Sequence, residues 1–163
     1  MRMNKNSLEK QIVDYVIKYK ENHYRLAYSY VKNVDDALDI VQESILKAIS
    51  SKDSLENTNY LKTWFYRIVV NTSLDFLRRQ KGVVVSDEES LIQNGPAVID
   101  EYQNIDLQRA LEDLPDKYRS VIVLRYFEDL KIEEIAEILN ENISTIKTRL
   151  YKAIDKLHIK MNF

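Results

Sequence analysis

The chain has 163 residues, of which 45% are hydrophobic and 31% are charged, and its formal net charge is −2. This length is enough for one domain or for two small ones. The sequence contains no Cys, which excludes a disulfide framework and a thiolate metal site. The small net charge excludes a uniformly basic nucleic-acid binder, so any DNA contact must come from local patches. No segment is apolar enough for a leader or a membrane span, which predicts a cytoplasmic protein.

The first predicted helix begins near Ser7 and continues, after a bend, to Val31. Its apolar residues recur three and four positions apart, as one buried face of a helix requires. His23 lies in this segment, and no second His or Cys is near enough in sequence to suggest a ligand set. His23 is therefore predicted to be a packing or surface residue, and Asn33 is expected to close the segment.

A second helix is predicted from Asp35 to Ile49, with Asp35 or Asp36 as its cap. One face is apolar and predicts core packing. The other face combines acids with aliphatic residues at helical spacing, namely Leu38, Asp39, Gln42, Glu43 and Leu46. Such a face is typical of a partner-binding surface, and it also fits a solvated face with scattered leucines.

The segment from Tyr60 to Lys81 predicts one long helix or two. Its cationic residues outnumber the single acid Asp75; they are Lys62, Arg67, Arg78, Arg79 and Lys81. The consecutive aromatic residues 64–66 cannot all face one core, so at least one is expected to be exposed. Exposed aromatic rings among cations are suited to unpaired nucleic acid, because bases stack on rings while cations follow the backbone. The plainer interpretation, a core stripe with a solvated basic flank, leaves Trp64, Arg67 and Asn71 unexplained.

The stretch from Gly82 to Asp106 has no sustained helical period, and it carries six acidic residues without one Lys or Arg. This composition predicts a linker between two helical domains. The predicted boundaries are a first domain at 1–81, an acidic linker at 82–105 and a second domain at 106–163. Residues 83–85 could form a short strand or docking segment.

After the linker, a short helix is predicted from Leu107 to Leu114, and Pro115 suits the first turn of another. The stretch from Lys131 to Leu157 then predicts two helices joined by a tight turn. Asn140 is expected to end the first of them, because Asn readily adopts the left-handed conformation. Ser144 or Thr145 is expected to cap the second.

The two halves of this helix pair differ in charge. The first is acidic, whereas the second carries Lys147, Arg149, Lys152, Lys156 and Lys160 against Asp155 alone. A sharp turn followed by a basic helix predicts a helix-turn-helix whose second helix enters the major groove of duplex DNA. An ordinary helical hairpin with a solvated lysine face is the alternative.

Four stretches resemble the extracytoplasmic-function (ECF) group of bacterial sigma factors. They are DDALDIVQESILKA from Asp35, KTWFYRIVVNTSLDFLR from Lys62, LPDKYRSVIVLRYFEDL from Leu114, and the helix-turn-helix ending TIKTRLYKAIDKL. They stand in the family's order and cover most of the chain outside the amino terminus and the linker. Where many members have Gly in the turn, this chain has Asn140, followed by Glu141 rather than an aliphatic residue.

The resemblance implies an all-α, two-domain initiation factor that binds core RNA polymerase and promoter DNA. It implies contact with the polymerase clamp through Leu38, Asp39, Gln42 and Glu43. For the melted −10 element it implies Lys62, Trp64, Arg67, Asn71, Asp75, Arg78 and Arg79, with Asn71 near the pocket for a flipped base. For the duplex −35 element it implies Ser144, Lys147, Thr148, Arg149, Tyr151 and Lys152.

The resemblance further implies control by an anti-sigma factor, anchored in the membrane, that would hold the protein at its inner face. No catalytic activity, cofactor, metal site or small-molecule substrate is expected. A stand-alone helix-turn-helix regulator is the first alternative, and it would need neither the face around Asp39 nor the patch around Trp64. An enzyme acting on nucleic acid is the second, but the sequence offers no phosphate loop or catalytic cluster for one.

Overall fold

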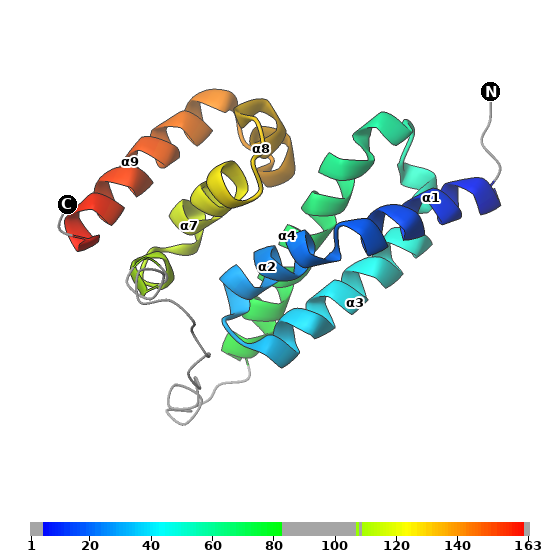
Figure 1. Ribbon diagram of the computed structural model, residues 1–163, viewed down its shortest axis with the longest axis horizontal. Helices are drawn as coiled ribbons and strands as arrows, with labels where there is room; N and C mark the ends of the chain where they lie inside the picture. Colours follow the sequence, from blue (N-terminus) through cyan, green and yellow to red (C-terminus); the bar gives the residue numbers. More distant parts are fainter. Residues whose placement is uncertain (1–4, 83–106, 108, 162–163) are drawn as a thin grey trace. The chain divides into compact units, whose positions relative to one another are not determined.

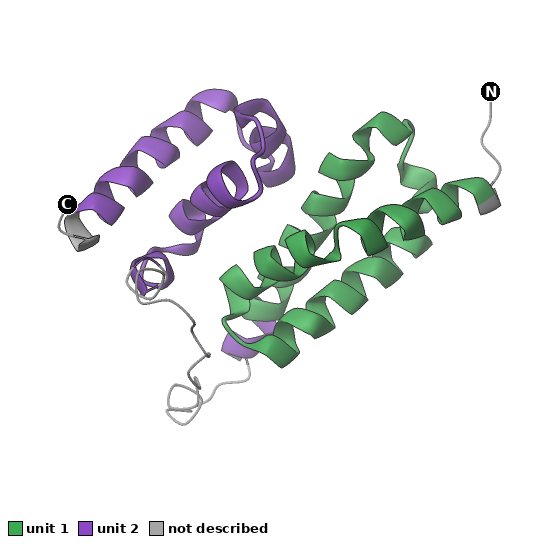
Figure 2. Cartoon of the chain, in the orientation of Figure 1, with its two compact units in different colours: residues 1–78 green, residues 79–163 purple. Residues whose placement is uncertain are grey.

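A computed structural model describes residues 5–82, 107 and 109–161 of the chain (Figure 1). Within these ranges the regular elements are all helical and no strand is present, which confirms the predicted all-α class. The chain divides into two compact units, residues 1–78 and residues 79–163 (Figure 2). Residues 83–105 of the predicted linker, including the possible strand at 83–85, lie outside the described residues.

Unit 1 begins with the predicted bent helix, which forms α1 (Lys5–Lys18) and α2 (Lys20–Val31). The bend is at Tyr19, whose φ of −111° and ψ of 24° leave the helical region. Backbone hydrogen bonds still cross the bend, from Tyr19 N to Tyr15 O and from His23 N to Tyr19 O. Lys32, with φ of 56°, ends α2, so the expectation that Asn33 closes the segment is wrong by one residue.

Asn33 instead caps the next helix, α3 (Val34–Ser50). Its side-chain Oδ1 accepts a hydrogen bond from the backbone N–H of Asp36 at 2.9 Å. The prediction of Asp35 or Asp36 as the cap is therefore wrong, since both lie in the first turn, where their charge favours the helix dipole. The inner face of α3 is buried at Ala37, Ile40, Ser44 and Ala48.

The short 3-10 turns Lys52–Ser54 and Thr58–Tyr60 lead into α4 (Leu61–Gly82), a single 22-residue helix. Phe65 and Tyr66 are buried, and Trp64 is only partly exposed. Phe65 packs edge-on against the ring of His23, with ring centroids 4.7 Å apart, and Tyr66 lies 4.9 Å from the same ring. His23 is fully buried, so it is a packing residue, one of the two alternatives that the sequence left open.

Unit 2 contains a helical segment at 109–112, then α7 (Asp116–Ile122), a π-helical turn (Val123–Phe127), α8 (Ile132–Leu139) and α9 (Ile143–Met161). Pro115 stands at the N-cap of α7, one residue before the first turn. The core of unit 2 includes Leu124, Ile135, Ile146 and Ala153, all at most 1% exposed. Ile138 is also buried, at 1% exposure, because α8 packs against both α9 and the π-helical turn.

The turn between α8 and α9 is a Schellman motif centred on Asn140, which has φ of 57° and ψ of 49°. The N–H of Glu141 bonds to Ala136 O at 2.9 Å, and that of Asn140 bonds to Glu137 O at 3.3 Å. The predicted helix stop at Asn140 is confirmed. The predicted cap at Ser144 or Thr145 is wrong, because Asn142 Oδ1 accepts the N–H of Thr145 at 2.9 Å.

Burial lowers the pKa of His23 to about 4, against a smaller opposing effect of the Tyr19 backbone. At pH values above about 6.5, the usual pKa of His, His23 is neutral and its contribution to the stability of unit 1 is fully present. This contribution is lost as the pH falls from about 6.5 towards 4, and it amounts to about 3 kcal/mol in the free energy of unfolding. Chemical denaturation followed by Trp64 fluorescence, the one tryptophan signal of the chain, measures this loss in unit 1.

The other histidine, His158, is exposed and supplies the control. His158→Gln is expected to keep the wild-type pH dependence between pH 4 and 6.5. His23→Gln is expected to flatten it. Equal pH dependence in wild type and His23→Gln would contradict the assignment to His23.

The left-handed backbone at Asn140 predicts a second stability effect. Asn140→Ala places a Cβ without a compensating polar group at positive φ, which costs about 1 kcal/mol, whereas Asn140→Gly relieves the constraint. Hydrogen exchange of the α8 and α9 amides is expected to accelerate in the Ala variant and not in the Gly variant. Identical exchange in the two variants would show that the turn does not depend on this conformation.

Candidate functional site

Helix α4 presents a continuous outward face along its length. Residues spaced three and four apart share one side of a helix, so five predicted residues fall on this side: Trp64, Arg67, Asn71, Asp75 and Arg78. Arg67, Asn71 and Arg78 are exposed, and Trp64 and Asp75 are partly exposed. We call these five residues the α4 face. Arg79 lies at its edge, whereas Lys62 is exposed on nearly the opposite side of the helix.

Trp64 is held in place at the beginning of the α4 face. Its indole Nε1–H donates a hydrogen bond to the Ser54 hydroxyl at 3.1 Å. The N–H is the only hydrogen-bond donor of the indole, so this bond orients the ring through its edge. Part of the ring remains exposed to solvent. A fixed, partly exposed ring next to the exposed Arg67 is suited to stacking with a base.

The far end of the α4 face contains an ion-pair cluster that joins α4 to α3. Arg78 Nη1 donates to Asp75 Oδ1 at 2.6 Å. Lys47 Nζ of α3 lies 4.0 Å from Asp75 Oδ2 and 3.1 Å from Glu43 Oε2. Lys47 also donates to the hydroxyl of the buried Thr72 at 3.2 Å. Lys47 does not stand out in the sequence pattern, because its position beside α4 depends on how α3 and α4 pack.

Helix α3 presents an acidic face with exposed aliphatic side chains. Leu38 is 50% exposed and Leu46 is 69% exposed, and Asp39 and Gln42 between them are exposed as well. We call these four residues the α3 face; Glu43 lies at its edge, on the side of Lys47. Leu46 was part of the sequence pattern but not of the implied contact set, and its exposure makes it a candidate contact residue.

The acids at the beginning of α3 repel one another. The pKa of Asp36 is raised by burial and, to a smaller extent, by the charges of Asp39 and Asp35. A cationic partner surface would relieve this repulsion. The α3 face is therefore suited to a protein partner that presents aliphatic groups together with Lys or Arg.

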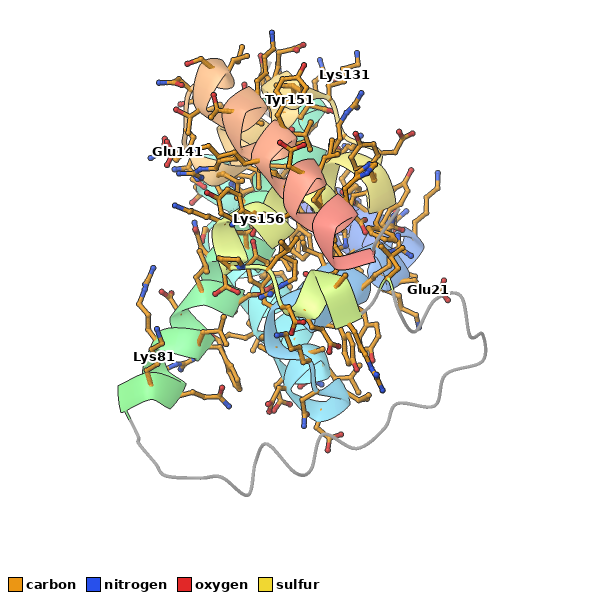
Figure 3. All side chains as sticks on the ribbon, turned by 90° about the vertical axis from the view of Figure 1, so that its left-hand side faces the viewer. Glu21, Lys81, Lys131, Glu141, Tyr151 and Lys156 are labelled. Carbon is orange, nitrogen blue, oxygen red and sulfur yellow. The ribbon has the colours of Figure 1, made fainter. Side chains whose placement is uncertain are left out.

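Helix α9 presents the basic outward face of the helix-turn-helix. Ser144, Lys147, Thr148, Tyr151 and Lys152 are all exposed and lie on one side of α9. Figure 3 shows Tyr151 and Lys156 on this helix and Glu141 at the turn before it. We call Ser144, Lys147, Thr148, Tyr151 and Lys152 the α9 face. It combines hydroxyl groups, cations and one aromatic ring, which are groups that contact phosphates and base edges.

Arg149 lies apart from the α9 face. It is 24% exposed, and its Nη2 donates to Glu141 Oε1 at 3.1 Å. This ion pair joins α9 to the turn, and Ser144 Oγ similarly donates to Asn142 Oδ1 at 2.9 Å. Both interactions join residues of the turn to the beginning of α9.

The described residues offer no group of three or more His, Asp or Glu that could hold a metal ion. Among these same residues, no helix is long and apolar enough to cross a membrane.

Comparison with known families matches both units of the chain. Residues 16–83 match the family described as sigma-70 region 2, and residues 104–157 match sigma-70, region 4. The first match contains the α3 and α4 faces, and the second contains the α9 face.

Characterised proteins are similar over nearly the whole chain. RNA polymerase sigma factor SigV of Bacillus subtilis is 49% identical, covering 96% of this chain and 95% of that protein. ECF RNA polymerase sigma factor SigW of the same organism is 34% identical, covering 88% and 85%. The ECF RNA polymerase sigma-E factor of Escherichia coli K12 is 30% identical, covering 90% and 84%.

Two solved structures share the fold. The sigma factor RpoE of Bartonella quintana, in complex with the anti-sigma factor NepR, has a TM-score of 0.76 and 25% identity, covering 94% of this chain and 98% of that one. CnrH, in complex with the cytosolic domain of CnrY, has a TM-score of 0.72 and 18% identity, covering 97% and 94%.

Proposed function

Because this chain belongs to the ECF group of the sigma-70 family, we propose that its α3, α4 and α9 faces bind, respectively, core RNA polymerase, the melted −10 element and the duplex −35 element. In this assignment residues 1–81 recruit polymerase and hold opened DNA, residues 106–163 read duplex DNA, and residues 82–105 connect them. The main support for this proposal is that the chain has three separate faces, each with side chains suited to binding one of these ligands.

The α3 face is assigned to polymerase through Leu38, Asp39, Gln42 and Glu43. Two exposed leucines supply apolar area, and the acids between them supply charge complementarity to a basic partner surface. A helix in contact with solvent alone gains nothing from exposing Leu38 and Leu46, whereas a docked helix buries them.

The α4 face is assigned to the single strand of the −10 element. Trp64 offers a stacking surface, Arg67, Arg78 and Arg79 offer charge for phosphates, and Asn71 stands between them with an exposed amide. An amide can donate to and accept from the edge of an unstacked base, which a cation alone cannot do. Lys62 is assigned to phosphate outside this face, and Asp75 to holding Arg78.

The α9 face is assigned to the major groove at the −35 element. Lys147 and Lys152 can reach phosphates or guanine, while Ser144, Thr148 and Tyr151 supply hydroxyl groups. Arg149 is assigned a supporting role through Glu141, since its ion pair fixes the beginning of the helix that enters the groove.

The chain is proposed to act without catalysis, cofactor or small-molecule substrate, leaving nucleotide chemistry to the polymerase. We also propose control by an anti-sigma factor that covers the α3 and α4 faces, because the structurally similar sigma factor RpoE was solved in complex with the anti-sigma factor NepR, and CnrH was solved with the cytosolic domain of CnrY. In this proposal the protein is cytoplasmic, and a membrane-anchored anti-sigma factor would hold it at the membrane. A stand-alone helix-turn-helix regulator is not favoured, since it has no use for the α3 and α4 faces.

Run-off transcription with core RNA polymerase on candidate promoters tests the proposal. The wild-type chain is expected to confer promoter-specific initiation. Asn71→Ala is expected to lose about tenfold on duplex templates and to recover on templates opened in advance at the −10 element, because one base contact supplies about 1–3 kcal/mol. Lys147→Ala is expected to lose about tenfold on both kinds of template.

Two exposed residues off the proposed faces serve as matched controls. Gln80→Ala removes an amide from the side of α4 opposite Asn71, and Lys156→Ala removes a cation from α9 beside the α9 face. Both are expected to transcribe like wild type. The proposal fails if polymerase gains no promoter specificity while the chain alone still binds duplex DNA, since that outcome identifies a stand-alone regulator.

A further inference from the structure

The indole of Trp64 is bonded to a short turn outside α4. Its Nε1–H donates to the hydroxyl of Ser54, the last residue of the 3-10 turn Lys52–Ser54, at 3.1 Å. The same hydroxyl donates its own proton to Ser51 O at 2.8 Å. A serine hydroxyl has a single proton, so with that proton on Ser51 O only its lone pairs are left for the indole. The bond to Ser51 therefore determines the direction in which Ser54 accepts.

The turn is itself joined to two further helices. Ser51, directly before it, caps the end of α3 and donates its backbone N–H to Lys47 O at 2.9 Å. Lys52, the first residue of the turn, donates from Nζ to Glu9 Oε2 of α1 at 2.7 Å. The Lys52 side chain is only 20% exposed, so most of it lies against unit 1. A series of contacts thus runs from α1 through the turn to the indole on α4.

The orientation of Trp64 matters for the ligand proposed for it. A ring that stacks on a base must keep its plane parallel to that base. A partly exposed indole that rotates freely loses this freedom on binding, and the loss reduces the affinity. An indole that is already oriented loses less. The bond from Trp64 to Ser54 supplies such an orientation before any DNA is present.

We propose that Ser54 is a positioning residue that orients Trp64 for stacking on an unpaired base, and that the ion pair of Lys52 with Glu9 holds the turn in place for it. This inference rests on the proposed function and adds three residues outside the α4 face to it. In this proposal none of the three touches the DNA, and each acts through Trp64.

Two measurements on the full-length chain test the role of Ser54. Fluorescence anisotropy of Trp64, the only tryptophan of the sequence, reports the mobility of the ring without DNA. The affinity of the chain in complex with core polymerase is measured for a promoter fragment whose −10 region is unpaired. Ser54→Ala is expected to lower the anisotropy and to weaken binding about three- to fivefold, because part of the stacking energy of one base is lost. Ser54→Thr keeps the hydroxyl and is expected to match wild type in both measurements.

A double-mutant cycle separates positioning from direct contact. If Ser54 acts only through Trp64, Ser54→Ala has no further effect on DNA affinity in a chain that already carries Trp64→Ala. The matched control is Ser50→Ala, which removes another exposed serine hydroxyl at the same end of α3, bonded to Lys47 O at 3.1 Å. It is expected to leave both the anisotropy and the affinity unchanged.

The ion pair is tested by two variants of opposite charge change. Lys52→Gln and Glu9→Gln each remove the pair, and each is expected to lower the anisotropy of Trp64 and to weaken DNA binding about twofold. A direct effect of charge on the DNA has the opposite sign in Glu9→Gln, because the loss of an acid favours DNA binding. Tighter binding by Glu9→Gln would therefore overturn the role of the ion pair.

Thermal denaturation shows which variants retain the fold. Unchanged anisotropy or unchanged DNA affinity in folded Ser54→Ala overturns the positioning role while the proposed function stands. An equal loss of affinity with and without Trp64 does the same, since it identifies Ser54 as a direct contact. If Trp64→Ala binds like wild type, or if the wild-type complex does not bind the fragment, the proposed function of the α4 face fails and the positioning role with it.

Discussion

The packing of Phe65 against His23 determines how α4 is rotated about its own axis. Their edge-to-face contact, with an interplanar angle of 83°, lies at the centre of unit 1, and both side chains are fully buried. Such an aromatic pair adds about 0.5–1.5 kcal/mol to the free energy of burial. Once Phe65 faces inward, the helical repeat places Trp64 and Asn71 on the outward side. The contact of Phe65 with His23 in the core therefore determines which residues of α4 face the proposed single-stranded DNA.

In unit 2 the corresponding constraint is the turn at Asn140. The left-handed conformation there ends α8 and redirects the chain, and Asn142 then caps α9. The ion pair between Glu141 and Arg149 holds the turn against the side of α9. The buried stripe of Ile146, Leu150 and Ala153 leaves Lys147 and Tyr151 outside. Shape and charge of the reading helix thus follow from one turn and one apolar stripe.

Helical periodicity predicted the helices and their outward faces well, because once one residue of a helix faces the core, the helical repeat determines which of its other residues face outward. It predicted the helix caps poorly. Around α3 and α9 several neighbouring residues can cap, and the one that does so depends on where the preceding left-handed residue, Lys32 or Asn140, redirects the chain. The contacts of Lys47 with Thr72 and of Arg149 with Glu141 could not be predicted either, because the sequence does not show which segments pack side by side.

The role of the α4 face in holding melted DNA can be tested by the permanganate reactivity of promoter thymines in complexes of core polymerase with the chain. We expect reactive, unpaired thymines in the −10 region with the wild-type chain, and their loss with Asn71→Ala while the complex remains bound to the promoter. Equal reactivity with both chains would mean that the α4 face takes no part in holding melted DNA. Bound complexes that show no reactive thymines even with the wild-type chain would contradict the melting role altogether.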